Sequence, residues 1–221
     1  MTRDLPLFAN PRLSLFLDSL DAGNSEFLDA LEEEAIHSQV PIIRRDTQRV
    51  LRTLLKMKKP GTVLEIGTAV GFSALLICEN SEAHVTTIEN YEKRIPIARE
   101  NFRKAGMEER ITFLTGDAGE ILPGLDGSFD LIFMDAAKGQ YIHFLREAKR
   151  LLAEGGVLIS DNCLQDGDLL ESHYAIDRRD RTIYKRMREY LTAISRDPEL
   201  ETVILPLGDG LAVSVKQSLH S

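Results

Sequence analysis

Short apolar runs alternate with helical stripes through the middle of the chain. Runs that suit buried strands lie at Val63–Ile66, His84–Glu89, Ile111–Thr115, Phe129–Met134 and Gly156–Ser160. Between them, apolar residues at helical spacing predict helices over Phe72–Cys78, Glu92–Ala105 and Tyr141–Leu152. This alternation predicts an α/β fold built on a doubly wound, mostly parallel sheet with right-handed crossovers.

The two ends of the chain follow different patterns. Before the first strand, apolar stripes predict helices over Leu13–Leu20 and Glu26–His37, and a third that Asp46 caps and Lys58 closes. After a long helix over Asp180–Ile194, a short Pro- and Gly-containing loop joins strands Glu201–Leu205 and Leu211–Val215. That loop is too short for a crossover helix, so the last two strands form an antiparallel hairpin and the sheet has seven strands.

Composition indicates one soluble domain. The 221 residues contain no long apolar run, so we expect no membrane contact, and residues 1–60 form a helical cover over a core at 61–221. The N-terminal stretch lacks the apolar region of a signal peptide, and the two cysteines lack metal-ligand spacing. Both features favour a cytoplasmic protein. The net charge of −8 argues against binding polyanions through overall charge.

The turn after the first strand, in VLEIGTAVGFS, indicates a nucleoside cofactor. Its spacing is Glu-x-Gly-x-x-x-Gly over Glu65, Gly67 and Gly71, which differs from the Gly-x-Gly-x-x-Gly of a dinucleotide site. An acid two residues before the first glycine favours a cofactor with an ammonium group, such as S-adenosylmethionine (SAM). A parallel sheet that ends in an antiparallel strand is also the topology of SAM-dependent methyltransferases. The spacing and the hairpin both disfavour an NAD-dependent dehydrogenase.

Acidic residues stand at the carboxyl ends of successive strands, where open α/β sheets bind ligands. Glu65, Glu89, Asp117, Asp135 and Asp161 each end a strand or follow one closely. Glu89 could accept hydrogen bonds from ribose hydroxyls, and Asp117 from an adenine amino group. Helix capping or an ordinary turn explains any single acid equally well, but five in succession favour a ligand site.

Asp135, Asp161 and Asn162 form the sharpest group. They end two neighbouring strands, so their oxygens can converge, and two carboxylates with an amide suit Mg²⁺ better than zinc. A bound cation would lower the pKa of a substrate hydroxyl. Lys138, in the loop after Asp135, could act as a base or hold an oxyanion, although most loop lysines are merely solvated.

Basic residues gather on the long C-terminal helix and just before it. Arg178, Arg179, Arg181, Lys185 and Arg186 lie within nine positions, and Arg44 and Arg45 could extend the patch. A charged helix face is most often only solvated, yet a local positive patch on an acidic chain is what a phosphate backbone requires. These residues therefore indicate a candidate surface for an RNA substrate.

These segments together resemble the metal-dependent O-methyltransferases of the catechol and caffeoyl-CoA type, which have the class I SAM methyltransferase fold. VLEIGTAVGFSA, FMDAAKGQY and GVLISDN carry the resemblance, and within that group the chain looks most like the bacterial tRNA 5-hydroxyuridine methyltransferases. The resemblance implies a homodimer, metal ligands at Asp135, Asp161 and Asn162, and a catalytic pair, Lys138 and Asp135. It implies cofactor contacts at Val40, Ile42, Glu65, Gly67, Thr68, Gly71, Phe72, Ser73, Glu89, Asp117, Ala118 and Asp135.

The predicted activity is therefore Mg²⁺- and SAM-dependent methylation of a hydroxyl oxygen. The favoured acceptor is 5-hydroxyuridine at the tRNA wobble position, which would become 5-methoxyuridine. The first alternative is a small catechol or phenolic ester, and the second is a nucleotide- or RNA-binding protein without catalysis. The second alternative leaves Asp135, Lys138, Asp161 and Asn162 without a joint purpose.

Overall fold

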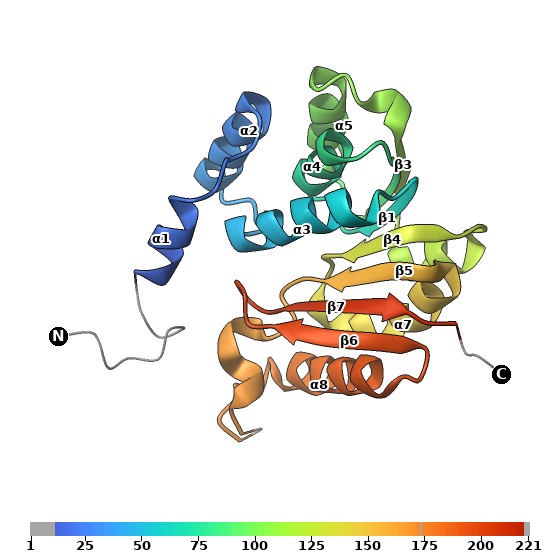
Figure 1. Ribbon diagram of the computed structural model, residues 1–221. Helices are drawn as coiled ribbons and strands as arrows, with labels where there is room; N and C mark the ends of the chain where they lie inside the picture. Colours follow the sequence, from blue (N-terminus) through green and yellow to red (C-terminus); the bar gives the residue numbers. More distant parts are fainter. Residues whose placement is uncertain (1–11, 173, 219–221) are drawn as a thin grey trace.

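A seven-stranded sheet forms the centre of the computed structural model, which describes residues 12–172 and 174–218 (Figure 1). The strand order is β3-β2-β1-β4-β5-β7-β6. The strands are β1 (Thr62–Ile66), β2 (His84–Glu89), β3 (Ile111–Thr115), β4 (Phe129–Met134), β5 (Leu152–Ser160), β6 (Leu200–Leu205) and β7 (Leu211–Lys216). The first five run parallel, and β7 is antiparallel to both β5 and β6. The predicted mostly parallel sheet with an antiparallel hairpin is confirmed.

The central strands β1 and β4 are buried on both faces, which is why they read as largely apolar runs. Val63 of β1 and Leu131 of β4 belong to one core cluster, whereas Leu64 and Ile132 belong to the other, on the opposite face of the sheet. The helices are α1 (Leu13–Asp18), α2 (Glu26–His37), α3 (Arg45–Lys58), α4 (Phe72–Asn80), α5 (Ile95–Lys104), α6 (Ala118–Ile121), α7 (Tyr141–Leu151) and α8 (Arg181–Arg196). Short 3₁₀ segments are η2 (Glu108–Arg110), η3 (Leu122–Gly124), η4 (Lys138–Gln140) and η5 (Gln165–Leu170).

Two predicted element starts move by three or more residues, and the prediction that Asp46 caps α3 is wrong, because that helix begins at Arg45 and Asp46 lies in its first turn. Helix α5 begins at Ile95 instead of Glu92, because residues 92–94 form a turn and Pro96 occupies the first helical turn, where its missing N–H costs nothing. Strand β5 begins at Leu152 instead of Gly156, and its pairing with β4 shifts register between Phe129 and Leu131. Both changes lie at element ends and leave the topology as predicted.

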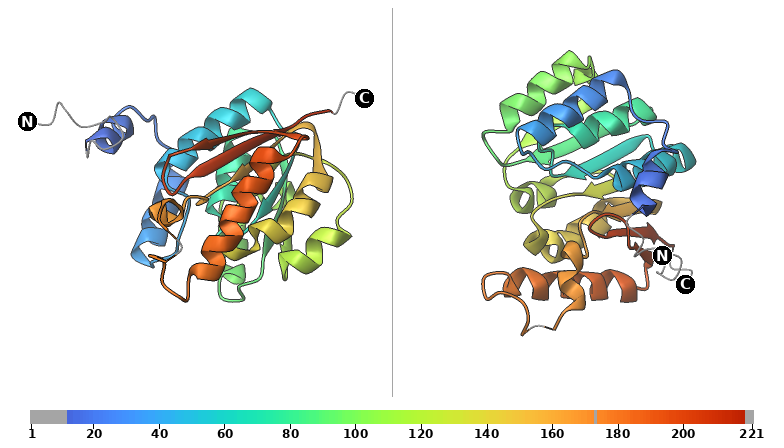
Figure 2. Two further views of the ribbon diagram at one scale, coloured as in Figure 1. Left: turned by 90° about the horizontal axis from the view of Figure 1, so that it is seen from below. Right: turned by 90° about the vertical axis from the view of Figure 1, so that its left-hand side faces the viewer.

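The N-terminal helices cover one face of the sheet beside α4. Leu28 of α2 and Leu51 and Leu55 of α3 are buried in the same core cluster as α4. Helix α1 is different, since it has no buried residue and stands at the edge of the molecule, away from the sheet (Figure 2). Residues 1–11 of the predicted cover lie outside the described residues. In the described part of the chain, every helix is too short or too polar to cross a membrane.

Candidate active site

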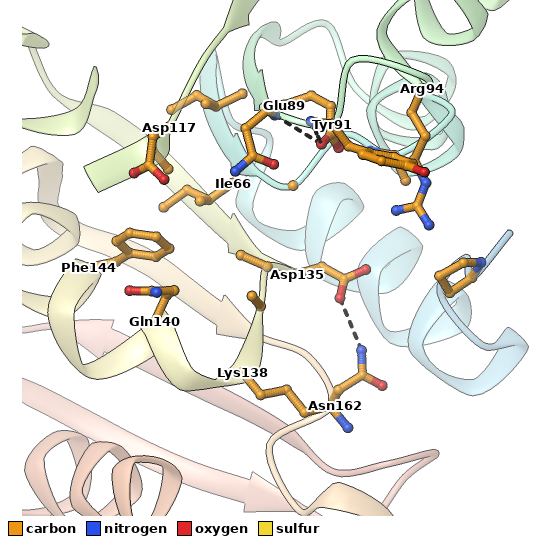
Figure 3. A pocket seen from close by; sticks show the side chains of 18 of the residues that line it. Ile66, Glu89, Tyr91, Arg94, Asp117, Asp135, Lys138, Gln140, Phe144 and Asn162 are labelled. Atoms are coloured by element: carbon orange, nitrogen blue, oxygen red, sulfur yellow. Dashed lines mark hydrogen bonds between the residues drawn. The ribbon is translucent and has the colours of Figure 1, made fainter. Parts of the chain in front are cut away.

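A cavity of about 710 Å³ opens at the carboxyl ends of the parallel strands (Figure 3). This volume is in the range of small-molecule sites, and the position is the usual one for ligands of open α/β sheets. Eight of the residues predicted to form a site line it: Ile42, Gly67, Glu89, Asp117, Ala118, Asp135, Lys138 and Asn162. Arg44 lines it as well.

Main-chain hydrogen bonds across the strand ends bring the two aspartates together. The N–H of Asp135 donates to the Ile66 carbonyl, and the N–H of Asp161 donates to the Met134 carbonyl, each at 3.0 Å. Asn162 then turns in the left-handed region at φ +56°, which asparagine tolerates better than most residues. Its Nδ2 donates to Oδ1 of Asp135 at 3.0 Å (Figure 3). The predicted group of three therefore converges.

The two carboxylates lie in surroundings that disfavour their charge. Burial raises the pKa of Asp135 to about 7, and the charge of Asp161 acts in the same direction, while a hydrogen bond from Asn162 lowers it. Burial raises the pKa of Asp161 too. A nearby cation would relieve both effects.

The donor set fits a hard divalent cation. Two carboxylates and an amide oxygen are donors that Mg²⁺ accepts, once rotation of the Asn162 amide turns its oxygen inward. The described residues contain no cluster of three or more His, Cys, Asp or Glu side chains suited to a metal, so this site needs the amide as its third donor.

Lys138 and Tyr141 flank this group from the segment after β4. Lys138 begins η4 and lines the cavity on the side of Asn162 (Figure 3). Tyr141 is fully buried, and its hydroxyl lies 3.1 Å from the Met134 carbonyl and 2.9 Å from the Asp161 carbonyl. The tyrosine therefore ties the ends of β4 and β5 to the start of α7, which fixes the loop that carries Lys138.

The turn after β1 packs directly against the turn after β4. A Cβ on Gly67 would lie 2.0 Å from the Asp135 carbonyl oxygen, so only glycine permits this approach. The carboxylate of Glu89 fixes the same turn, because it accepts hydrogen bonds from the N–H groups of Ala69 at 2.8 Å and Tyr91 at 2.7 Å. Its Oε1 also accepts from the N–H of Asn90 at 2.9 Å, so only Oε2, which accepts from Ala69, retains a lone pair for a ligand.

The other residues predicted to bind the cofactor lie outside the cavity lining: Val40, Glu65, Thr68, Gly71, Phe72 and Ser73. Glu65 is fully buried, and one of its oxygens accepts from Thr87 while Oε1 has no hydrogen-bond partner among the described residues. Burial raises its pKa to about 7. Asp161 is buried behind the lining as well, next to Asn162.

Asp117 caps a helix and also lines the cavity. Its Oδ1 accepts from the N–H of Gly119 at 2.7 Å and caps the four-residue helix α6. Its side chain also lines the cavity at the end opposite Arg94 (Figure 3). Capping uses one oxygen, and the other is left for a ligand.

Most residues of the predicted basic patch contact different acids or carbonyl groups of the chain. Arg44 pairs with Asp209 at 2.7 Å, and Arg45 pairs with Glu32 at 2.8 Å, so each is held by a local acid. Arg186 donates to the Gly139 carbonyl at 3.3 Å, next to Lys138. The remaining contacts are Arg179 with Asp180, Arg181 with the Ile176 carbonyl and Lys185 with Glu189, while Arg178 is exposed. Of these patch members, Arg44 lines the cavity and Arg186 contacts the loop that carries Lys138.

Several residues that shape the cavity are not among those predicted from the sequence. Tyr91, Arg94, Gln140 and Phe144 line it, although none belongs to the predicted site. The Tyr-x-x-Arg spacing directly after Glu89 is a usable signal for the first two, because residues at the start of a loop after a parallel strand face the ligand edge. Thr47, which contacts Asp161, carries no signal in the sequence, because that contact depends on how α3 packs.

With this geometry in view, comparison with known proteins assigns the chain. A family model described as O-methyltransferase matches residues 18–217. The chain belongs to this O-methyltransferase family. The catechol O-methyltransferase of Mycobacterium tuberculosis is 33% identical over 165 residues, covering 72% of this chain and 75% of that protein. Caffeoyl-CoA O-methyltransferase 2 of Populus trichocarpa is 33% identical over 184 residues, covering 76% and 72%.

Solved structures agree with the family assignment. A candidate caffeoyl-CoA O-methyltransferase from Staphylococcus aureus superimposes with a TM-score of 0.85 at 33% identity, covering 92% of this chain and 98% of that one. The methyltransferase PaMTH1 of Podospora anserina, solved with S-adenosylhomocysteine (SAH) bound, gives a TM-score of 0.84 at 25% identity and covers 94% of each chain. The class I methyltransferase fold is therefore confirmed.

Proposed function

We propose that this O-methyltransferase transfers the methyl group of SAM to a hydroxyl oxygen on an aromatic ring. The observation that carries the proposal is the convergence of Asp135, Asn162 and Lys138 along one side of a cavity of nucleoside size. Asp117 and Phe144 line the other end of that cavity, where an adenine would fit between an apolar face and a hydrogen-bond acceptor. Glu89, between the two ends, would accept from the ribose.

The chain's own residues then position two reactants and manage one proton. The acceptor oxygen forms a bond to the methyl carbon as the carbon–sulfur bond of SAM breaks, and the hydroxyl proton leaves. Asp135, Asp161 and Asn162 would hold a divalent cation, which lowers the pKa of an acceptor hydroxyl. Lys138 would take the proton or stabilise the oxyanion. Holding the donor and acceptor in line can itself supply several kcal/mol of barrier reduction.

Two classes of acceptor fit this chemistry, and the comparisons favour the first. The relatives named above act on catechol or caffeoyl-CoA according to their names, and this supports a small catechol or phenolic ester. A ring of this size would place its hydroxyl near Lys138 and Asn162, and its binding would not require a basic surface outside the cavity.

The second candidate is 5-hydroxyuridine in tRNA, the acceptor that the sequence favours. Arg186 supports it, because its guanidinium contacts the carbonyl of Gly139, the residue after Lys138. A phosphate backbone bound along the start of α8 would therefore pass close to the catalytic loop. Arg178, Arg179 and Lys185 are exposed on the same part of the chain.

Measuring methyl transfer to tRNA and to a free catechol distinguishes the two candidate acceptors. Replacing Arg178, Arg179 and Lys185 with alanine should sharply lower transfer to tRNA that contains 5-hydroxyuridine, reduce the salt dependence of kcat/KM, and leave transfer to a free catechol unchanged. Arg146→Ala is the matched control, since Arg146 is exposed on α7 and does not line the cavity. Transfer to catechol alone, or tRNA transfer that is unaffected by the triple change, would exclude the tRNA acceptor.

A further inference from the structure

Arg94 projects from the loop after β2 to the end of the cavity opposite Asp117. It stands immediately before α5, and both it and Tyr91 line the cavity (Figure 3). Its guanidinium carbon lies 5.3 Å from the centre of the Tyr91 ring, a cation–π contact that holds the guanidinium plane at this rim.

Arg94 differs from Arg44, which is paired with Asp209 at 2.7 Å. Its charge, like that of Lys138, acts on Asp135 across the cavity, but neither side chain forms a close ion pair among the described residues. The Arg94 guanidinium forms no hydrogen bond in the described part of the chain, although it carries five N–H donors in a rigid fork, and its one close contact is the Tyr91 ring. A fixed, unpaired fork at a cavity wall is suited to a carboxylate.

The methyl donor of the proposed function supplies such a group. The amino-acid end of SAM carries an ammonium and a carboxylate on the same carbon. Figure 3 shows Asp135 and Arg94 on the far side of Glu89 from Asp117 and Phe144. With its adenine at Asp117 and Phe144 and its ribose at Glu89, SAM would extend its amino-acid end towards Asp135 and Arg94. An acid on one side and a guanidinium on the other match the two charges of the zwitterion.

We infer that Arg94 binds the methionine carboxylate of SAM and selects donors that carry it. This rests on the proposed function, because it assumes that the cavity holds the methyl donor. Tyr91 then acts as a positioning residue, since its ring fixes the guanidinium plane while making no polar contact with the carboxylate. A lysine at position 94 would restore the charge without the planar fork.

Binding of two ligands that differ only in the carboxylate tests this inference. SAH and its decarboxylated analogue are titrated by calorimetry into the wild-type protein, Arg94→Met and Arg99→Met. Arg99 is the matched control, since it lies on α5 with its guanidinium 5.0 Å from the Phe113 ring and does not line the cavity. The wild type and Arg99→Met should prefer SAH by roughly 10- to 100-fold, the scale of a charge-assisted pair. Arg94→Met should bind both ligands about equally, through loss of SAH affinity alone.

Three results would overturn the inference. Equal losses for both ligands in Arg94→Met would mean that Arg94 supports the fold of the rim. If Arg94→Met still prefers SAH over its decarboxylated analogue and has a raised KM for the acceptor, the guanidinium contacts the acceptor instead. Binding of neither ligand to the wild type would reject the SAM assignment, and the inference with it, so failure of the proposed function is distinguishable.

Discussion

Thr47 donates a hydrogen bond to Oδ1 of Asp161 at 3.1 Å, although the two residues lie 114 positions apart. The N–H of Asn162 donates to the same oxygen at 2.9 Å. Both donors leave Oδ2 of Asp161 unused, and both fix the orientation of the carboxylate. Helix α3 therefore contributes to the proposed metal site without supplying a ligand.

Replacing Thr47 with valine tests this contribution, because the shape is kept and the hydroxyl is lost. Partners of metal ligands typically change metal affinity by roughly 10- to 100-fold, and we expect a loss of that size for Mn²⁺ or Mg²⁺ measured by calorimetry. Thr47→Ser retains the donor and should bind nearly as the wild type does. Equal metal affinity in all three proteins would show that the hydrogen bond serves only the packing of α3.

Lys138 should matter for the chemical step and not for donor binding. Lys138→Met is expected to lower kcat by roughly 10²- to 10⁴-fold, the range for loss of a general acid–base group, while the affinity for SAH stays the same. Rapid-quench measurement of a single turnover separates chemistry from product release. Lys138→Arg discriminates the two possible roles, because it preserves positive charge but cannot accept the proton at neutral pH. Unchanged kcat in Lys138→Met would remove the residue from the mechanism.

Glu65 should make the ligand-free protein more stable at low pH. Its pKa is raised by burial from 4.5 to about 7, so the folded state binds more protons than the unfolded state between these values. The stabilisation is complete below pH 4.5 and is lost as the pH rises through 7. On the scale of the pKa shift it amounts to roughly 3 kcal/mol.

Urea unfolding from pH 4.5 to 7.5 measures this dependence, and Glu65→Gln should make it shallower. Part of the slope will remain, because burial also raises the pKa values of Asp135 and Asp161. An Asp126→Asn variant serves as control, since Asp126 lies in the loop before β4 and outside the cavity. The same slope in Glu65→Gln and the wild type would show that Glu65 titrates normally in the folded protein.

The homodimer stays a prediction, and α1 offers a surface for it. Leu15, Phe16 and Leu20 are 69%, 61% and 67% exposed, on a helix and adjoining turn that pack against little of their own chain. If a second copy covers them, Phe16→Asp should convert a dimer to a monomer in light scattering after gel filtration. Leu170→Asp, at an 81% exposed leucine elsewhere, should leave the dimer intact. A wild-type monomer would contradict the prediction.

Periodicity predicted most of the fold because both faces of the sheet are covered. Val63 and Leu64 point to opposite layers and are both buried, so β1 reads as one apolar run. The start of α5 was wrong by three residues, since the helical spacing of Ile95 and Ala98 extends back over a turn that only Pro96 marks. Local patterns identify elements well and their first turns poorly.

In the candidate site as well, the residues at strand ends could be predicted from the sequence, and those placed by helix packing could not. Asp135 and Asn162 could be predicted together because parallel strands end at one edge and the residues that follow share it. Thr47 and Phe144 could not, since their places depend on how α3 and α7 pack against the sheet. Glu65 lies behind the cavity lining because successive side chains of β1 point to opposite faces of the sheet. The Glu65 side chain points to the same face as Val63, which is the face that α4 covers.

Transfer of a deuterated methyl group tests the central claim most directly. The purified protein is incubated with SAM labelled as CD₃, Mg²⁺ and either a catechol or tRNA containing 5-hydroxyuridine, and the products are analysed by mass spectrometry. We expect a CD₃ group on a ring oxygen of at least one acceptor, and we expect this transfer to be lost on metal chelation and in Asp161→Asn. No transfer to either acceptor, or transfer at full rate without a divalent cation, would contradict the central claim.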